Sequence, residues 1–332
     1  MRRLMVLVMC GCGDDVPATG DAATDGTADA AITTCAPAPG WTPAPALARG
    51  PTQETATVAV GTRLYVLGGF DETLGVLATV QVFDTATCAW SMGPALPRPV
   101  HHINATTIGT TIWITGAIET LNFTSVGHVW SWDTSSAADW TVHAAMPATT
   151  QRGASVAGAI GTTIYVAGGL RSGAVAEVTA FDTIAGTWTT ALPPLPATRD
   201  HGCGAVVGGK LYVIGGRAGN INARTASVEE YTPGGAWVTR APMPTARGGT
   251  ACGVIGGRII VVGGEGNPAT ASGVFAEVEA YDPATNTWET LAPMTSPRHG
   301  MGAAVVGGSL YVPGGANMQA FAAVATHDVF TP

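Results

Sequence analysis

The chain contains six copies of one short pattern, and this repetition limits its fold more than any other feature. Five copies are an apolar run that ends in Gly-Gly: Leu64–Gly69, Ile164–Gly169, Leu211–Gly216, Ile259–Gly264 and Leu310–Gly315. A degenerate sixth copy, Ile112–Ala117, lies between the first two. A spacing of about 50 residues is typical of folds that stack one supersecondary unit per repeat. The fold is therefore decided by how the six units pack together.

Each unit also carries an aromatic residue followed by Asp and, a few residues later, a tryptophan. The sets are Phe83-Asp84 with Trp90, Trp132-Asp133 with Trp140, Phe181-Asp182 with Trp188, and Tyr281-Asp282 with Trp288; one unit keeps Tyr231 and Trp237 but has Thr232 instead of Asp. Asp favours a tight turn, because its carboxylate accepts hydrogen bonds from the nearby backbone. Four short strand-like runs per unit predict a four-stranded antiparallel sheet. Such a sheet cannot bury both faces alone and must stack around an axis.

These motifs resemble the kelch repeat, and the resemblance covers residues 41–332. It implies an all-β fold, a six-bladed kelch β-propeller with four-stranded antiparallel blades. Composition agrees, because 45 glycines among 332 residues are about twice the usual share of roughly 7% and suit a protein with many tight turns.

The two ends of the chain are predicted to complete one blade together. The chain ends at Asp328–Pro332 before its last unit reaches a tryptophan strand, while Trp41–Arg49 near the N-terminus matches Trp288–Arg298. We therefore expect the N-terminal segment to supply the outer strand of the last blade, which removes an open sheet edge.

The N-terminus reads as an export signal. Two arginines precede the apolar run Leu4–Met9, which Cys10 and Cys12 follow. Positive charge before a short apolar run resembles a secretory signal, and a closing cysteine resembles a bacterial lipoprotein cleavage site. Cys12, preceded by the small Gly11, fits lipidation better than Cys10. A disordered start with chance cysteines is the alternative.

Three regions follow from this reading. Residues 1–12 are predicted to be the signal peptide and lipoprotein cleavage region, 13–34 a flexible Asp/Ala/Thr/Gly linker, and 35–332 the propeller. The protein is expected to be exported, either as a lipoprotein of the outer or another cell-envelope membrane or as an extracellular protein.

The cysteines of the propeller suggest one disulfide. Cys35 and Cys88 precede the tryptophan strands of the last and first blades, which become neighbours when the ring closes. A Cys35–Cys88 disulfide is therefore plausible in an oxidising compartment, with two unpaired thiols as the alternative. Cys203 and Cys252 fall at successive offsets on neighbouring inner strands. Because side chains alternate along a strand, we expect these two to face differently, as separate small buried residues.

Arginines recur just before the inner strands, at Arg98, Arg152, Arg199, Arg247 and Arg298, with Arg49 near that place. Their periodicity favours a structural role, bonding carbonyls or carboxylates within each blade, over recognition of a ligand.

Binding residues are expected where the repeat does not dictate the residue type. Kelch propellers commonly bind partners on the face that carries the loops after Gly-Gly and the loops leading into the inner strands. The side chains predicted on this face are Gln53, Asp71, His101, His102, Arg171, Asp200, His201, Arg217, Glu265, His299 and Asn317. They would form a shallow polar bowl; an ordinary solvated loop face is the alternative.

Several kinds of chemistry are disfavoured. The four histidines of this face come from three blades, two of them opposite, whereas metal–nitrogen bonds of about 2.1 Å require close convergence, so no metal and no cofactor are predicted. All six tyrosines belong to the repeat, which leaves none for the chemistry of galactose oxidase or of sialidase propellers. The net charge of −8 argues against nucleic acid.

The sequence thus predicts a monomeric, surface-anchored propeller that binds a protein or glycan and touches a membrane only through its lipid anchor. Binding is favoured over catalysis. One alternative is an enzyme performing acid–base chemistry on a sugar, resembling the kelch-type sialate mutarotases, with Asp200, His201, Glu265 and His299 as proton-transfer groups. A purely structural envelope protein is the other alternative.

Overall fold

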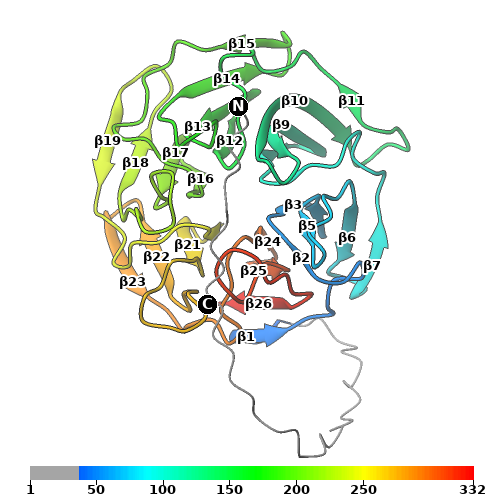
Figure 1. The fold of residues 1–332 in the computed structure, drawn as a ribbon, viewed down its shortest axis with the longest axis vertical. Coiled ribbons are helices and arrows are strands. Elements are labelled where there is room, and N and C mark those ends of the chain that lie inside the picture. The colour runs from blue at the N-terminus through cyan, green and yellow to red at the C-terminus, as the bar shows by residue number, and fades with distance from the viewer. Residues whose placement is uncertain (1–36) are drawn as a thin grey trace, which may run out of the picture. The chain divides into compact units, whose positions relative to one another are not determined.

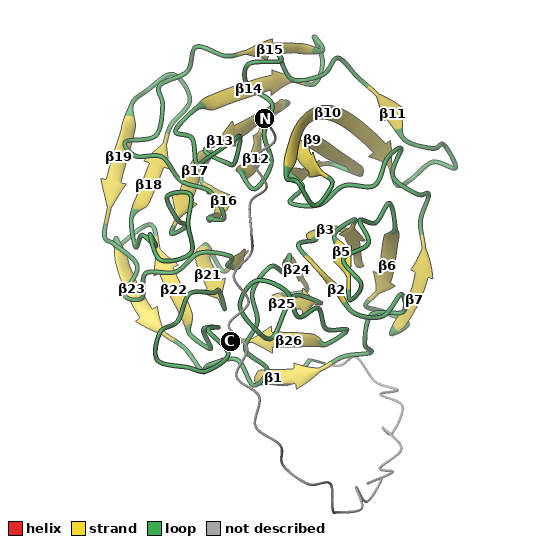
Figure 2. Cartoon of the chain, viewed as in Figure 1, coloured by secondary structure: helices red, strands yellow, loops and turns green. Residues whose placement is uncertain are grey.

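The computed structural model describes residues 37–332, which form six four-stranded antiparallel sheets arranged in a ring (Figure 1). These residues form strands and loops (Figure 2). The predicted six-bladed propeller is confirmed. The predicted signal region, linker and Cys35 lie outside the described residues.

Every blade runs from an inner strand at the axis to an outer strand at the rim. Blade 1 is β3 (Ala56–Val60), β4 (Arg63–Leu67), β6 (Val80–Asp84) and β7 (Ala89–Met92). Blade 2 is β8 (Ala105–Ile108), β9 (Thr111–Glu119), β10 (Thr124–Asp133) and β11 (Thr141–Val142). Blade 3 is β12 (Val156–Ile160), β13 (Thr163–Ala167), β14 (Val178–Asp182) and β15 (Thr187–Thr189).

The other three blades repeat this order. Blade 4 is β16 (Cys203–Val207), β17 (Lys210–Ile214), β18 (Val228–Tyr231) and β19 (Trp237–Arg240). Blade 5 is β20 (Ala251–Ile255), β21 (Arg258–Val262), β22 (Val278–Asp282) and β23 (Thr287–Thr290). Blade 6 is β24 (Ala304–Val306), β25 (Ser309–Pro313), β26 (His327–Thr331) and β1 (Gly40–Pro43), and a short extra pair joins β2 (Thr52–Gln53) to β5 (Phe70–Asp71).

The ring closes as predicted, with β1 pairing antiparallel to β26. Trp41 lies opposite Phe330, and its indole N–H donates to the carbonyl of Ala292 in the preceding blade at 3.0 Å. The same bond recurs between successive blades, from Trp90 to Pro45, Trp140 to Pro94, Trp188 to Ala144, Trp237 to Pro193 and Trp288 to Ala241. Each tryptophan therefore links its blade to the one before it.

The structural role of the repeat arginines is confirmed for Arg152, Arg199, Arg247 and Arg298, whose side chains are buried and donate to backbone carbonyls. Arg49 and Arg98 differ, because their side chains are exposed and pair with the partly buried carboxylates of Asp71 and Glu119. In blades 1 and 2 the chain position that is equivalent to the buried arginines is occupied by Thr52 and Val100. Their carbonyls accept from Gly315 and Gly69, as the carbonyl of Arg247 accepts from Gly216.

Cys203 and Cys252 form a disulfide, with their Cα atoms 5.9 Å apart, so the expectation of two separate residues was wrong. Cys203 lies at the first position of β16 and Cys252 at the second position of β20. This offset places them on opposite faces of equivalent strands. Neighbouring blades meet through opposite faces, so the offset brings the two sulfurs together. Cys88 also takes part in a disulfide; its predicted pairing with Cys35 stays a prediction, because Cys35 is not described.

Replacing both Cys203 and Cys252 by Ser is expected to lower the free energy of unfolding by about 2–4 kcal/mol, because the cross-link restricts the unfolded chain. Thermal melting without reductant measures this. The control is the same pair of proteins under reducing conditions, where the gap between their melting temperatures should close. Equal melting without reductant would show that this disulfide does not stabilise the protein.

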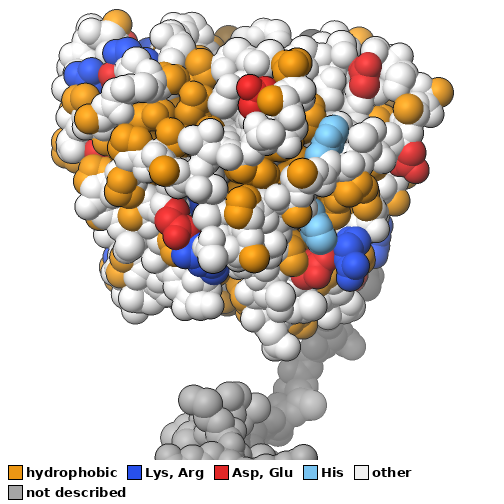
Figure 3. All heavy atoms as spheres, turned by 90° about the horizontal axis from the view of Figure 1, so that it is seen from above, with side chains coloured by type: hydrophobic (Ala, Val, Ile, Leu, Met, Phe, Trp, Pro, Cys, Tyr) orange, Lys and Arg blue, Asp and Glu red, His pale blue; other side chains and the backbone are white. Residues whose placement is uncertain are grey.

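The surface carries few charges. Figure 3 shows one side of the ring, where hydrophobic and uncharged side chains dominate and the few charged side chains of both signs lie interspersed. Residues 37–332 include no helix long and apolar enough to span a bilayer.

Candidate functional site

Two sets of loops meet at one end of the ring. In each blade, the residue leading into the inner strand pairs with the residue that follows the Gly-Gly position. These pairs are Gln53–Phe70, His101–Ile118, Gly153–Leu170, Asp200–Arg217, Gly248–Glu265 and His299–Ala316. The register read from the sequence is therefore correct, and the two loop sets share one face.

A closed ring of six backbone hydrogen bonds surrounds the axis at this end; we call it the axial ring. The N–H to C=O bonds run from Glu54 to Gly300, His102 to Glu54, Ala154 to His102, His201 to Ala154, Gly249 to His201, and Gly300 to Gly249. All six residues have a positive φ, between 50° and 67°. The axial ring fixes one residue of every blade close to the axis.

The axial ring brings three long polar side chains into contact. His102 Nε2 lies 2.9 Å from His201 Nε2 and 3.2 Å from a carboxylate oxygen of Glu54. The other three ring positions are Ala154, Gly249 and Gly300, which leave room for these side chains. The expectation that the histidines stay apart was therefore wrong, because the axial ring is narrow enough for alternate blades to touch.

A second layer of buried polar groups supports this contact. His201 Nδ1 lies 2.5 Å from Asp200 Oδ1, and Arg217 donates to the same carboxylate at 3.0 Å. Arg217 also pairs with Glu265 and reaches His201 Nε2 at 3.0 Å. His299 Nδ1 lies 3.5 Å from Glu265. The four proton-transfer candidates, Asp200, His201, Glu265 and His299, thus converge.

Burial determines the protonation of these groups. Desolvation raises the pKa of Glu54 to about 7, lowers that of His101 to about 4, and lowers those of His102 and His201. Burial also acts to raise the pKa of Asp200, but the hydrogen bond from His201 and the charge of Arg217 outweigh it and hold that pKa below its usual value. Burial therefore favours the neutral form of these three histidine rings.

A cavity of about 300 Å³ opens above these groups. Its polar lining is Glu54, His102, His201, Arg217, Glu265 and His299, and its apolar wall is Phe123, Ile221, Ala320 and Phe321. Phe321 is 49% exposed, so an apolar ring stands at the mouth. Glu54 and the apolar wall are not among the predicted binding residues. The repeat register places Glu54 at the same ring position as His102 and His201, whereas no repeat signal marks the wall residues.

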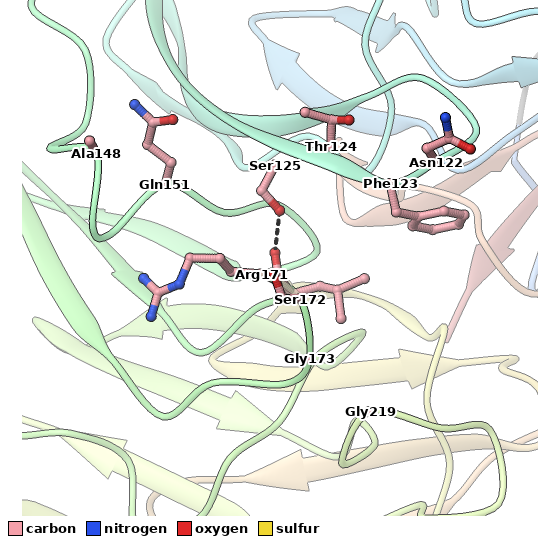
Figure 4. Close-up of a pocket in the computed structure, with 11 residues that line it drawn as sticks. Asn122, Phe123, Thr124, Ser125, Ala148, Gln151, Arg171, Ser172, Gly173 and Gly219 are labelled. Atoms are coloured by element: carbon pink, nitrogen blue, oxygen red, sulfur yellow. Dashed lines mark hydrogen bonds between the residues drawn. The ribbon is translucent and has the colours of Figure 1, made fainter. Parts of the chain in front are cut away.

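A larger pocket of about 570 Å³ lies beside the cavity and shares Phe123 with it. Figure 4 shows Gln151 and Arg171 on one side of this pocket and Phe123 on the other. Arg171 is held by two hydrogen bonds to the carboxylate of Glu177, at 2.7 and 2.8 Å. Arg171 is thus the predicted binding residue that belongs to this pocket rather than to the cavity.

Six predicted residues do not line the cavity: Arg171, Asp200, which is buried behind His201, and four others. Gln53 is buried and holds a neighbouring loop through Ala320 and Ala322, and His101 supports His102 from behind. Asp71 caps its own turn at Thr73 and Gly75. Asn317 lines a separate pocket with Arg298 and Thr326.

Comparison with known proteins agrees with the repeat pattern. Residues 41–216 match the KLHDC2/KLHL20/DRC7 Kelch-repeats domain, and residues 199–244 and 246–295 match the Kelch motif. The chain is similar to Kelch-like protein terF of Aspergillus terreus, with 32% identity over 80% of this chain and 61% of that protein. It is also similar to human Kelch-like protein 23, with 27% identity over 76% of this chain and 43% of that protein.

The chain therefore spans less than two thirds of the length of these curated relatives, one fungal and one animal. The match to the Kelch-repeats domain alone covers more than half of the chain. This chain belongs to the kelch-repeat family.

Proposed function

We propose that this chain is an exported, monomeric binding propeller that recognises a protein or glycan through the loop face around the axial cavity. One observation carries the proposal: the cavity combines fixed, buried polar groups with an exposed aromatic wall. Kelch domains generally bind protein partners, which agrees with a recognition role.

The cavity is suited to one protruding group of a larger ligand. Its volume of about 300 Å³ is at the lower end for ligand pockets, which suits an amino-acid side chain or one sugar ring. Arg217 is already held by Asp200 and Glu265, so its free donors need little reorganisation to meet a ligand. Phe123 and Phe321 offer flat apolar surfaces, and the pocket beside Phe123 extends the site.

The disulfide between Cys203 and Cys252 supports export, because such bonds persist mainly in oxidising compartments. We propose that lipidation of Cys12 anchors the exported protein. Cys12→Ala is then expected to release the protein into the soluble fraction or to block its maturation. Membrane fractionation and lipid labelling measure this, and an unchanged distribution with unchanged labelling would exclude Cys12 as the anchor.

Phe321→Ala tests the binding site with little risk to the fold, because this side chain is half exposed. A ligand is first obtained by screening the purified protein on a glycan array and by pull-down from envelope extract. Removing an aromatic anchor should weaken binding of that ligand by about 2 kcal/mol, roughly 30-fold, with little change in melting temperature.

The matched control is Ile184→Ala, which removes an exposed apolar side chain from the hairpin between β14 and β15. Its binding should equal that of wild type. If Phe321→Ala binds normally while Ile184→Ala does not, the ligand site lies on the outer rim and the proposal fails. Arg217→Ala should also weaken binding, by about 1.5–3 kcal/mol. It is a poorer probe, because its loss leaves Asp200 and Glu265 unpaired.

A second candidate function is acid–base chemistry on a sugar in the same cavity. The convergence of Asp200, His201, Glu265 and His299 favours it. If the protein is an enzyme of this kind, Asp200→Asn should abolish mutarotation of a sugar, followed by NMR of its anomers, while sugar binding survives. Undetectable wild-type turnover across the sugars that bind would remove this candidate.

A further inference from the structure

The histidines of the axial ring present unprotonated nitrogens to one another. His101 Nε2 lies 3.1 Å from the carbonyl oxygen of Thr120, which can only accept, so Nε2 carries the proton. Its Nδ1 must then accept, and His102 Nδ1, 2.5 Å away, donates to it. In a neutral ring this leaves His102 Nε2 without a proton. That bare nitrogen faces His201.

The Nε2 atom of His201 is also unprotonated. Its Nδ1 lies 2.5 Å from Asp200 Oδ1, and a carboxylate accepts, so Nδ1 carries the proton and Nε2 does not. The two unprotonated Nε2 atoms of His102 and His201 are 2.9 Å apart, and the guanidinium of Arg217 approaches that of His201 at 3.0 Å. Two lone pairs at this distance repel each other unless a cation or a proton lies between them.

Further electron-pair donors surround this contact. A carboxylate oxygen of Glu54 lies 3.2 Å from His102 Nε2, and its other oxygen lies 3.8 Å from His299 Nδ1. His299 is 1% exposed, and its Nδ1 has no hydrogen-bond partner among the described residues. Its Nε2 donates to the carbonyl of Met318, so in a neutral ring Nδ1 carries a lone pair. The site thus gathers lone pairs in a buried place.

We propose that Glu54, His102 and His201 bind one divalent transition-metal ion of the Zn²⁺ type, with an open coordination position facing the cavity. The three ligand atoms lie within 4.8 Å of one another. A tetrahedral zinc ion with bonds of about 2.0–2.1 Å separates its ligands by about 3.3 Å. The observed separations of 2.9 and 3.2 Å are close to that value, so binding needs only small side-chain movements.

The donor types and their supports suit such an ion. Two imidazoles and one carboxylate favour Zn²⁺ and similar metals over Mg²⁺ and Ca²⁺, which prefer oxygen ligands. Histidines that bind metal usually hold their other ring nitrogen on a carboxylate or another fixed group. Asp200 does this for His201, and His101 for His102.

The backbone adds an independent observation. All six residues of the axial ring are left-handed, a conformation that glycine adopts most easily and that costs other residues about 1 kcal/mol or more. Only Gly249 and Gly300 are glycines, and Ala154 is the other small residue. The three positions that carry long side chains despite this cost are the three proposed ligands.

Arg217 supplies the sharpest test, because its guanidinium donates to His201 Nε2 at 3.0 Å and so competes for the lone pair that the metal needs. A bound metal must displace this contact. The positive charge of the Arg217 guanidinium also repels a cation bound nearby. Arg217→Gln should therefore tighten Zn²⁺ binding at least tenfold. A purely structural cluster would lose stability in this variant and gain no metal affinity.

The experiment titrates the purified, chelator-treated full chain with ZnCl₂ and with CoCl₂, following heat and the visible absorption of Co²⁺. We expect one equivalent per chain with nitrogen and oxygen ligands. A thiolate-to-cobalt charge-transfer band would instead assign the metal to cysteines and contradict the proposal. Glu54→Gln and His102→Gln should weaken binding at least a hundredfold, and Asp200→Asn by about 10- to 100-fold through the orientation of His201.

The matched control is His128→Gln, which removes a histidine paired with one carboxylate, Glu119, at 2.9 Å. It should leave the stoichiometry and affinity unchanged. The proposal is overturned if wild type binds no Zn²⁺, or if binding survives His102→Gln in a variant shown by circular dichroism to be folded. Weaker binding by Arg217→Gln would equally overturn it. Phe321→Ala should bind Zn²⁺ normally, so failure here and failure of the proposed ligand site are distinguishable.

Discussion

Removing the chain up to Arg49 is expected to destabilise the propeller more than any substitution proposed here. This deletion takes away β1, whose strand pairs with β26 over four residues, and exposes an unpaired sheet edge. It also removes buried Ala44 and Leu47, whose N–H groups donate to carbonyls of His327 and Ala325. Thermal and urea unfolding should show a loss of more than about 3–5 kcal/mol, the cost of removing one large core side chain.

Two smaller variants separate the parts of this effect. Trp41→Ala removes the packing on Phe330, at 5.1 Å between ring centroids, and the bond to Ala292, while it keeps the strand. The free energy of unfolding of this variant should lie between that of wild type and that of the deletion. Thr42→Ala, which keeps both the tryptophan and the strand, is the control and should melt near wild type. Equal melting of the deletion and the full chain would mean that the last blade closes without β1.

The fold could be predicted because the repeat fixes the same local structure six times. A single tryptophan strand would say little, but five complete units and one incomplete unit required the Trp41 segment to complete the last blade. The errors arose where neighbouring blades meet. One residue of offset between Cys203 and Cys252 places their side chains on opposite faces of equivalent strands, which predicts separation if each strand is treated alone. Facing blades reverse that relation, and the disulfide results.

The sequence predicted the loop face and part of the polar lining of the candidate site, but not the distances between its side chains. The Gly-Gly register correctly placed His102 and His201 on one face, since each blade contributes the same loop. The expectation that these two side chains stay apart assumed that the loops lie far from the propeller axis. The narrowness of the axial ring depends on six left-handed residues bonding in a ring, which no single repeat reveals. The repeat pattern does not predict Phe321 either, because this residue lies in a loop of blade 6 whose sequence no other blade shares.

Arg247→Met is expected to lower the free energy of unfolding by about 3–5 kcal/mol, since it leaves Glu279 as an unpaired buried charge. Arg247 is fully buried, and it also donates to the carbonyls of Gly263 and Thr245. Its position inside the blade predicts unchanged affinity for Zn²⁺ and for any cavity ligand. Urea unfolding measures the first effect and titration the second.

The double variant Arg247→Met/Glu279→Leu divides this loss between charge and backbone pairing. Replacing both members of a buried ion pair with apolar residues is often neutral. The double variant should therefore regain the share of the unfolding free energy that the single variant lost through the unpaired charge of Glu279. The part that remains reports the carbonyls that Arg247 satisfied. The control is Arg98→Ala, whose side chain is 63% exposed and whose surface pair with Glu119 should contribute less than about 1 kcal/mol. If Arg247→Met costs no more than Arg98→Ala, the buried arginines do not hold the blades together.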